Sequence, residues 1–154
     1  MSDPGVGLFA RHSPVLDRWI QIGLAGGRVI KVDILDDPPR DSDEEHPMLD
    51  RLERYVAGEA HSFIDVEIAL TGPTEHRPVY ETIRHVPYGT EVEVSDVLER
   101  IASLRAGEGG ERIVRSAIEA NPVPIIVPDH RIADVDGALP PRIRAQLREI
   151  EAID

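Results

Sequence analysis

Cysteine is absent from the 154 residues, and aromatic residues make up only 4% of the chain. Without a thiol the chain forms no disulfide, has no cysteine nucleophile and offers no cysteine-based zinc site. No apolar run approaches the length of a membrane span, and no signal peptide is evident. We therefore expect a cytoplasmic protein that does not associate with membranes.

Lysine is nearly absent as well: Lys31 is the single one, and 29 acidic residues face 17 basic ones, giving a net charge of -12. Such a composition is typical of proteins from salt-loving organisms, whose acidic surfaces hold water. It argues against a broadly basic DNA-binding surface, so any contact with DNA must rest on a local patch. A hydrophobic content of 41% argues against a disordered acidic chain.

Residues 1–72 are predicted to form a strand-rich first domain. Two runs of alternating residues, 20–24 and 30–34, flank Gly26 and Gly27 and indicate a hairpin. A helix is expected from Pro47, and residues 64–70 alternate as a third half-buried strand. The histidines lack metal-ligand spacing and are taken as surface residues, so no metal or cofactor is expected: His12, His46 and His61.

Residues 73–154 are predicted to form a helical second domain, and the turn sequence T-G-P-T at 71–74 marks the boundary. Helices are expected from Pro78, from a cap at Ser95, over residues 111–120 and from Pro140-Pro141. In the helix over 111–120, the apolar stripe leaves four residues on the outer face: Arg112, Arg115, Ser116 and Glu119.

The stretch N-P-V-P-I-I-V-P-D-H-R-I, residues 121–132, excludes regular secondary structure because its three prolines lack backbone N–H donors. It joins an apolar, rigid segment to Asp129, His130 and Arg131. Taken alone, it fits either a wall that holds polar groups in a site or a buried crossing followed by a polar turn.

This stretch resembles the active-site segment of the O6-alkylguanine-DNA alkyltransferases, N-P-x-P-x-x-x-P-C-H-R-(V/I). Every fixed position matches except the acceptor cysteine, which is Asp129 here. The turn P-Y-G at 87–89 and the closing stretch R-A-Q-L-R-E-I-E at 144–151 also resemble family patterns. The resemblance is specific over residues 79–151 and implies a cysteine-free, alkyltransferase-like member.

The resemblance implies an α+β fold. Residues 1–72 would form a ribonuclease-H-like domain without catalysis of its own, and residues 73–154 a winged-helix-like DNA-binding domain. Asp129 would occupy the acceptor position, with His130 and Glu151 completing the family's proton relay. Arg112 aligns with the arginine that replaces the extruded nucleotide. The remaining candidates for DNA contact or support of the pocket are Tyr88, Arg115, Asn121, Arg131 and Ile132.

Two further departures from the family pattern argue against a repair activity. The tyrosine that turns the target phosphate falls at Val94, and the glycine-rich stretch after H-R-I becomes A-D-V-D-G-A-L-P-P. A carboxylate is also a weaker nucleophile than a thiolate toward an alkyl ether carbon.

The expected function is therefore binding of O6-alkylguanine in double-stranded DNA by nucleotide flipping, without alkyl transfer. The protein would act as a monomer, with other DNA-repair proteins as further partners. Two alternatives remain open. One is an alkyltransferase or dealkylase that uses Asp129, and the other is a protein-interaction module that has kept the fold but not DNA binding.

Overall fold

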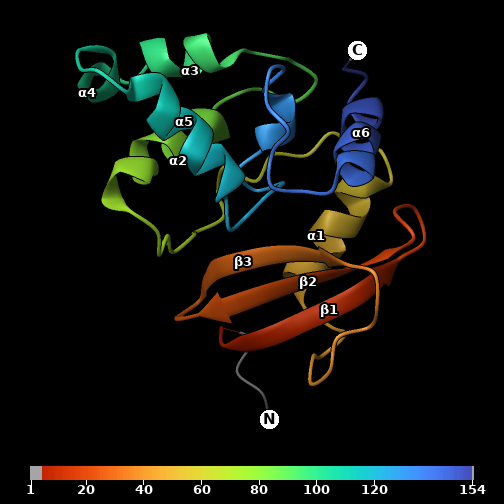
Figure 1. Cartoon of the computed structure of the whole chain (residues 1–154). Coiled ribbons are helices and arrows are strands. Elements are labelled where there is room, and N and C mark those ends of the chain that lie inside the picture. Colours follow the sequence, from red (N-terminus) through yellow and green to blue (C-terminus); the bar gives the residue numbers. More distant parts are fainter. Residues whose placement is uncertain (1–4, 154) are drawn as a thin grey trace.

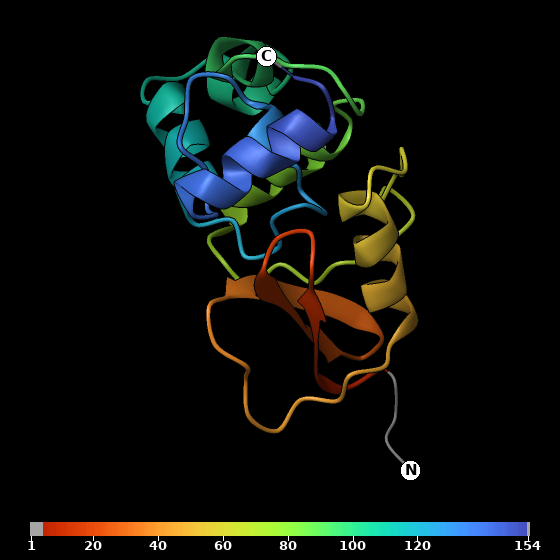
Figure 2. The same ribbon diagram turned by 90° about the vertical axis from the view of Figure 1, so that its right-hand side faces the viewer.

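The computed structural model describes residues 5–153 and has an α+β fold. Figure 1 shows a three-stranded sheet at one end of the molecule and helices α2 to α6 at the other. Helix α1 packs along one face of the sheet and reaches toward α6, which the perpendicular view in Figure 2 also shows. The expected fold class and the strand-rich first part are confirmed.

The sheet is an antiparallel meander of β1 (Gly7–Ser13), β2 (Arg18–Ala25) and β3 (Arg28–Leu35). Gly26 and Gly27 turn the chain between β2 and β3 with φ values of 58° and 76°. Two successive residues at positive φ suit a tight hairpin turn, and glycine adopts them without steric cost. The predicted hairpin is confirmed, whereas strand β1 was not predicted.

The third strand predicted over residues 64–70 is wrong. Residues 64–66 lie in a turn and a bend, and the rest of the segment meets β3 at one isolated bridge. There the N–H of Val29 donates to Glu67 O at 3.0 Å, and the N–H of Ala69 donates to Val29 O at 3.0 Å. Ile64 is 46% exposed. Apolar and polar residues therefore also alternate in a segment that only covers the edge of a sheet. The alternation by itself does not identify a strand.

Helix α1 spans Pro47–Val56 and buries the face that carries Leu49, Leu52 and Tyr55. His46 caps its first turn, because the Nδ1 atom accepts the backbone N–H of Met48 at 3.0 Å. His46 is half-buried and also lies against the ring of Phe9. The assignment of His46 to the surface is thus corrected: the imidazole satisfies a free helix N–H.

The helices of the second part bury the apolar stripes seen in the sequence. They are α2 (Arg77–Arg84), α3 (Val94–Glu99), α4 (Ala102–Arg105), α5 (Gly110–Glu119) and α6 (Pro141–Ile150), with short 3₁₀ turns at Thr74–His76 and Asp129–Arg131. Ser95 is not the cap of α3. Glu93 and Asp96 form a capping box there, and each side chain accepts the other residue's backbone N–H.

A single hydrophobic cluster runs through both parts of the chain, from Phe9 to Leu147. The N–H of Val32 in β3 donates to Pro122 O at 2.9 Å, which joins the sheet to the proline-rich segment. Nothing in this packing tests the domain boundary placed at residues 72 and 73, which stays a prediction. Within residues 5–153, every helix is too short or too polar to cross a bilayer.

Gly110 begins α5 at a point where a side chain does not fit. A Cβ atom there would lie 2.6 Å from Leu104 O and 2.7 Å from Leu98 Cδ1. We expect Gly110→Ala to lower the free energy of unfolding by about 1–3 kcal/mol, measured by urea denaturation. Gly107→Ala is the matched control, because no atom lies within 4 Å of its Cβ position. Equal stabilities of the two variants would contradict this account of Gly110.

Candidate functional site

The proline-rich segment folds around the side chain of Asn121. Its Nδ2 atom donates to Val127 O and to Asp129 Oδ2, each at 3.0 Å, while its Oδ1 atom accepts the N–H of Val123 at 3.0 Å. Ile125 adopts a φ of 78° within this turn, a conformation that costs a β-branched residue about 1–3 kcal/mol. The amide of Asn121 supplies the hydrogen bonds that the prolines lack.

Asp129 lies at the centre of this arrangement and is only 1% exposed. Its Oδ2 atom accepts hydrogen bonds from Asn121 and from the N–H of Ala138, the latter at 3.1 Å. Burial raises the pKa of Asp129, and these two donors oppose the rise. Gly137 leaves room for the carboxyl group, since a Cβ there would lie 2.8 Å from Oδ1. Asp129 thus ties the segment 133–140 to the proline-rich segment.

Glu151, at the end of α6, is the most heavily hydrogen-bonded side chain of the site. Arg131 donates from Nε to Oε1 at 2.8 Å and from Nη2 to Oε2 at 3.0 Å. The N–H of Gly89 donates to Oε1 at 2.9 Å, and His130 Nε2 lies 2.6 Å from Oε2. Burial alone would raise the pKa of Glu151, but the hydrogen bonds from His130, Arg131 and Gly89 outweigh it and lower the pKa.

His130 is fully buried and meets Glu151 directly. Beside an ionised carboxylate, His130 Nε2 carries a proton and donates it to Glu151 Oε2. Nδ1 has no hydrogen-bond partner within the described part of the chain. The structure therefore brings together the predicted pair His130 and Glu151, while Asp129 has partners of its own.

Tyr55 completes this cluster and was missed by the sequence analysis. It comes from α1 in the first part of the chain, is 1% exposed, and its hydroxyl donates to Glu151 Oε2 and lies 3.0 Å from His130 Nε2. Burial raises the pKa of Tyr55, and the charge of Glu151 raises it further. Only its place in an apolar helical stripe was visible in the sequence, and that pattern is equally typical of a core residue.

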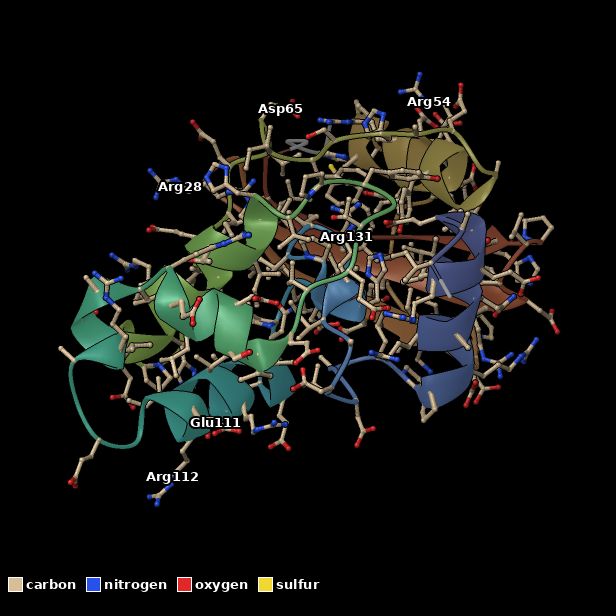
Figure 3. All side chains as sticks on the ribbon, turned by 90° about the horizontal axis from the view of Figure 1, so that it is seen from above. Arg28, Arg54, Asp65, Glu111, Arg112 and Arg131 are labelled. Carbon is tan, nitrogen blue, oxygen red and sulfur yellow. The ribbon has the colours of Figure 1, made fainter. Side chains whose placement is uncertain are left out.

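Arg112 and Arg115 lie on α5, the first exposed and the second half-buried. Figure 3 shows Arg112 at the edge of the molecule with its side chain pointing outward. Arg115 is held by ion pairs, at 3.1 Å to Glu111 and at 3.6 Å to Asp134. Of these two arginines, Arg112 is the one that presents its charge outward.

The other predicted DNA-contacting residues lie mostly inside the molecule. Arg131 is 7% exposed, donates from Nη1 to Val86 O at 2.6 Å and lies over the ring of Tyr88. Ile132 is completely buried and Asn121 is 5% exposed. A direct DNA contact by these residues has no support in their positions, because each is committed to internal packing or hydrogen bonds; the contact stays a prediction.

No group of three or more potential metal-ligating side chains occurs among residues 5–153. The site is instead a pair of neighbouring hydrogen-bonded clusters, one around Asp129 and one around Glu151. The first holds the segment 133–140, which contacts Arg115 of α5 through Asp134. The second joins α1 to α6. This arrangement can position groups rigidly, and it provides no thiolate for nucleophilic attack.

The sequence and the fold of this chain are similar to those of known proteins. Residues 74–152 match the family model described as "6-O-methylguanine DNA methyltransferase, DNA binding domain". The methylated-DNA–protein-cysteine methyltransferase of Methanopyrus kandleri is 34% identical over 92 residues, which cover 60% of this chain and 66% of that protein. The corresponding protein of Methanosarcina acetivorans is 35% identical over 89 residues, 54% of its length. The chain thus matches less than two thirds of these relatives.

A longer match links the chain to the DNA base-flipping protein of Thermus thermophilus, 30% identical over 132 residues, 82% of this chain and 84% of that protein. Among solved structures, the Mycobacterium tuberculosis O6-methylguanine methyltransferase has a TM-score of 0.73 and 23% identity, with 94% of this chain and 93% of that chain covered. That likeness concerns the fold. The family model and the Thermus relative together show that this chain, which lacks cysteine, belongs to the 6-O-methylguanine DNA methyltransferase family.

Proposed function

We propose that this protein takes part in DNA repair by binding O6-alkylguanine in double-stranded DNA, flipping the nucleotide out of the helix without transferring the alkyl group. The observation that carries the proposal is Asp129. It stands where the family pattern has its acceptor cysteine, and its carboxyl group is buried and tied to Asn121 and Ala138.

The chemistry of Asp129 argues against alkyl transfer. The nucleophile toward an alkyl ether carbon must be a soft, strongly nucleophilic group, as a thiolate is. The Oδ2 atom of Asp129 already accepts two hydrogen bonds, which lower the nucleophilicity of its lone pairs. Asp129 serves instead as an acceptor that shapes the pocket.

Two observations support DNA as the partner. Arg112 presents its charge outward near the beginning of α5, within the region that matches the family's DNA-binding domain. A structure of the Mycobacterium tuberculosis enzyme in complex with DNA has the same fold, with a TM-score of 0.72 and 23% identity. The name of the Thermus thermophilus relative supports nucleotide flipping. We assign Arg112 the place of the extruded nucleotide in the duplex.

The pair His130 and Glu151 acts structurally in this proposal. Without a thiol there is no proton for the pair to remove, and the carboxylate of Glu151 is engaged by Tyr55, Gly89 and Arg131. These contacts fix α1, α6 and the turn after α2 around the proline-rich segment. The cluster would therefore hold the lesion pocket in shape.

The wild-type protein should leave O6-methylguanine intact. Incubation with a methylated duplex, followed by mass spectrometry of the protein, should show no gain of a methyl group, because Asp129 is a poor acceptor. A methyl ester at Asp129, or repeated demethylation of the duplex, would refute the absence of transfer.

Asp129→Cys is the positive control for this experiment. It restores the family motif beside His130, and we expect single-turnover methylation of the new thiol. Loss of one supporting hydrogen bond in such a site costs about 2.7–4 kcal/mol, so the rate should be roughly a hundredfold or more below that of an ordinary family member. A folded Asp129→Cys variant that binds the duplex but gains no methyl group would show that the lesion never reaches position 129.

Arg112→Ala should abolish measurable binding of the methylated duplex, because the outward arginine is proposed to enter the DNA. The free energy of unfolding should change by no more than about 0.5 kcal/mol, since the residue is exposed. Electrophoretic mobility shifts and urea denaturation measure the two effects. Arg40→Ala, an exposed arginine in the loop after β3, is the matched control and should bind like wild type. Equal affinities of the two variants would contradict the role of Arg112.

Glu151→Gln should destabilise the protein by about 3–5 kcal/mol at pH 7, because it leaves Arg131 buried without its counter-charge. The folded pKa of Glu151 lies below the unfolded value of about 4.3. Its contribution is therefore complete above that pH and is lost as the pH falls through the folded pKa. Urea denaturation from pH 7 to pH 3 should show the gap between wild type and variant narrowing below about pH 4.

Glu149→Gln, two residues earlier on α6 and exposed, is the control for this series. It should track the wild-type stability within about 0.5 kcal/mol at each pH. A constant gap between wild type and Glu151→Gln at every pH would show that the charge of Glu151 contributes nothing.

A further inference from the structure

A pocket of about 460 Å³ opens between the segment that follows α1, the end of α2 and the proline-rich segment. Two of its lining side chains, Phe63 and Tyr88, are aromatic, and Ile125 and Ile126 add apolar surface. Small-molecule sites in proteins commonly have volumes of about 300–1,000 Å³ and mostly apolar walls with a few polar groups. The pocket therefore has the size and lining of a site for one aromatic ring system with a substituent.

The lining of this pocket differs in charge from the protein as a whole. It contains no aspartate or glutamate, although acidic residues outnumber basic ones by 29 to 17 overall. Three other pockets along residues 5–153 each carry acids: Asp65 and Glu81 in one, Glu119 and Asp136 in another, and Glu149 in the third. The lining of this pocket therefore contributes no negative charge of its own, although Arg84 also lines the neighbouring pocket that carries Asp65 and Glu81.

Arg84 gives the pocket a fixed positive charge. Its Nη2 atom donates to the carbonyl oxygens of Phe63, Ile64 and Val66 at 2.9, 3.3 and 2.6 Å, which holds the guanidinium in the wall. Its Nε–H is buried and has no hydrogen-bond partner within the described residues. The guanidinium is thus held in place, and its positive charge attracts an anionic group in the pocket.

The other basic groups of the lining are less suited to this role. Arg131 is already paired with Glu151, and His61 accepts a hydrogen bond from Arg51. Asp65 and Glu81 both act on Arg84 through space, and Asp65 forms its own hydrogen bonds with Arg51 at 2.8 and 3.0 Å. Arg84 is therefore the anchor, and the exposed His85 lies in the same lining.

We propose that this pocket binds a small planar aromatic ligand that carries one anionic group, a phosphate or a carboxylate. The ring packs on Phe63 and Tyr88, and the anion is held by Arg84. In Figure 3, Arg112 and Asp65 lie at opposite edges of the molecule, and Asp65 adjoins the pocket residue Ile64. The site is thus separate from the DNA contact proposed for Arg112 and does not rest on it.

The test is an NMR titration of the full chain, labelled with ¹⁵N, against guanosine monophosphate and naphthalene-2-carboxylate. We expect at least one of them to give saturable shifts at the amides of Ser62, Ile64 and Tyr88. Guanosine, which lacks the charge, and ribose 5-phosphate, which lacks the ring, should each bind at least about tenfold more weakly. Binding of guanosine as tightly as the anionic probes would overturn the proposal.

Arg84→Gln should weaken binding at least about tenfold, while Arg100→Gln, the same change at an exposed arginine after α3, should leave it unchanged. Because Arg84 also donates to three carbonyl groups, its replacement can disturb the wall of the pocket. A second variant, Ala60→Trp, removes no hydrogen bond and places a large ring at an exposed position of the lining. It should weaken binding to a similar degree. Absence of saturable shifts with both anions up to about 10 mM, or wild-type affinity in both variants, would refute the site.

Discussion

The buried carboxylate of Glu151 is the constraint on which the arrangement of the molecule depends. An ionised carboxylate inside a protein is stable only when its oxygens are fully hydrogen-bonded and its charge is balanced. Here the partners come from separate parts of the chain: Tyr55 in α1, Gly89 after α2, and His130 and Arg131 beside the proline-rich segment. Satisfying one side chain therefore fixes the relative positions of several elements.

An aspartate at the position of the family's cysteine is compatible with this fold because the neighbouring groups donate hydrogen bonds to its carboxyl group. Asn121 and the N–H of Ala138 donate to its carboxyl group, and Gly137 leaves the space that the carboxyl oxygens need. A buried aspartate without such donors would be strongly destabilising. The surroundings of position 129 thus accommodate a carboxyl group, which is consistent with the proposed binding of a lesion without alkyl transfer.

The hairpin, most of the helices and the juxtaposition of His130 with Glu151 were predictable, since they follow from local periodicity and from one specific motif. The break between α3 and α4 was not, because a single helix was expected there. The role of Tyr55 was not predictable, because its hydroxyl donates to Glu151, which is 96 residues away in the sequence, and a local sequence pattern does not show such a contact. The strand predicted over residues 64–70 was wrong for a related reason. Alternation indicates which side chains are buried, whereas strand pairing depends on which other segment lies beside the backbone. Likewise, the capping role of His46 depends on the orientation of its ring.

The contact of Tyr55 with Glu151 also restricts how the chain can be divided. The region shared with the family model, residues 74–152, excludes α1 and the sheet, yet it contains a buried charge that Tyr55 helps to satisfy. A fragment cut at this boundary would open that charge to solvent and expose the apolar surface that β3 and α1 cover. A chimera that takes its first half from a relative would fold stably only where the helix that replaces α1 carries a hydroxyl group at the position of Tyr55.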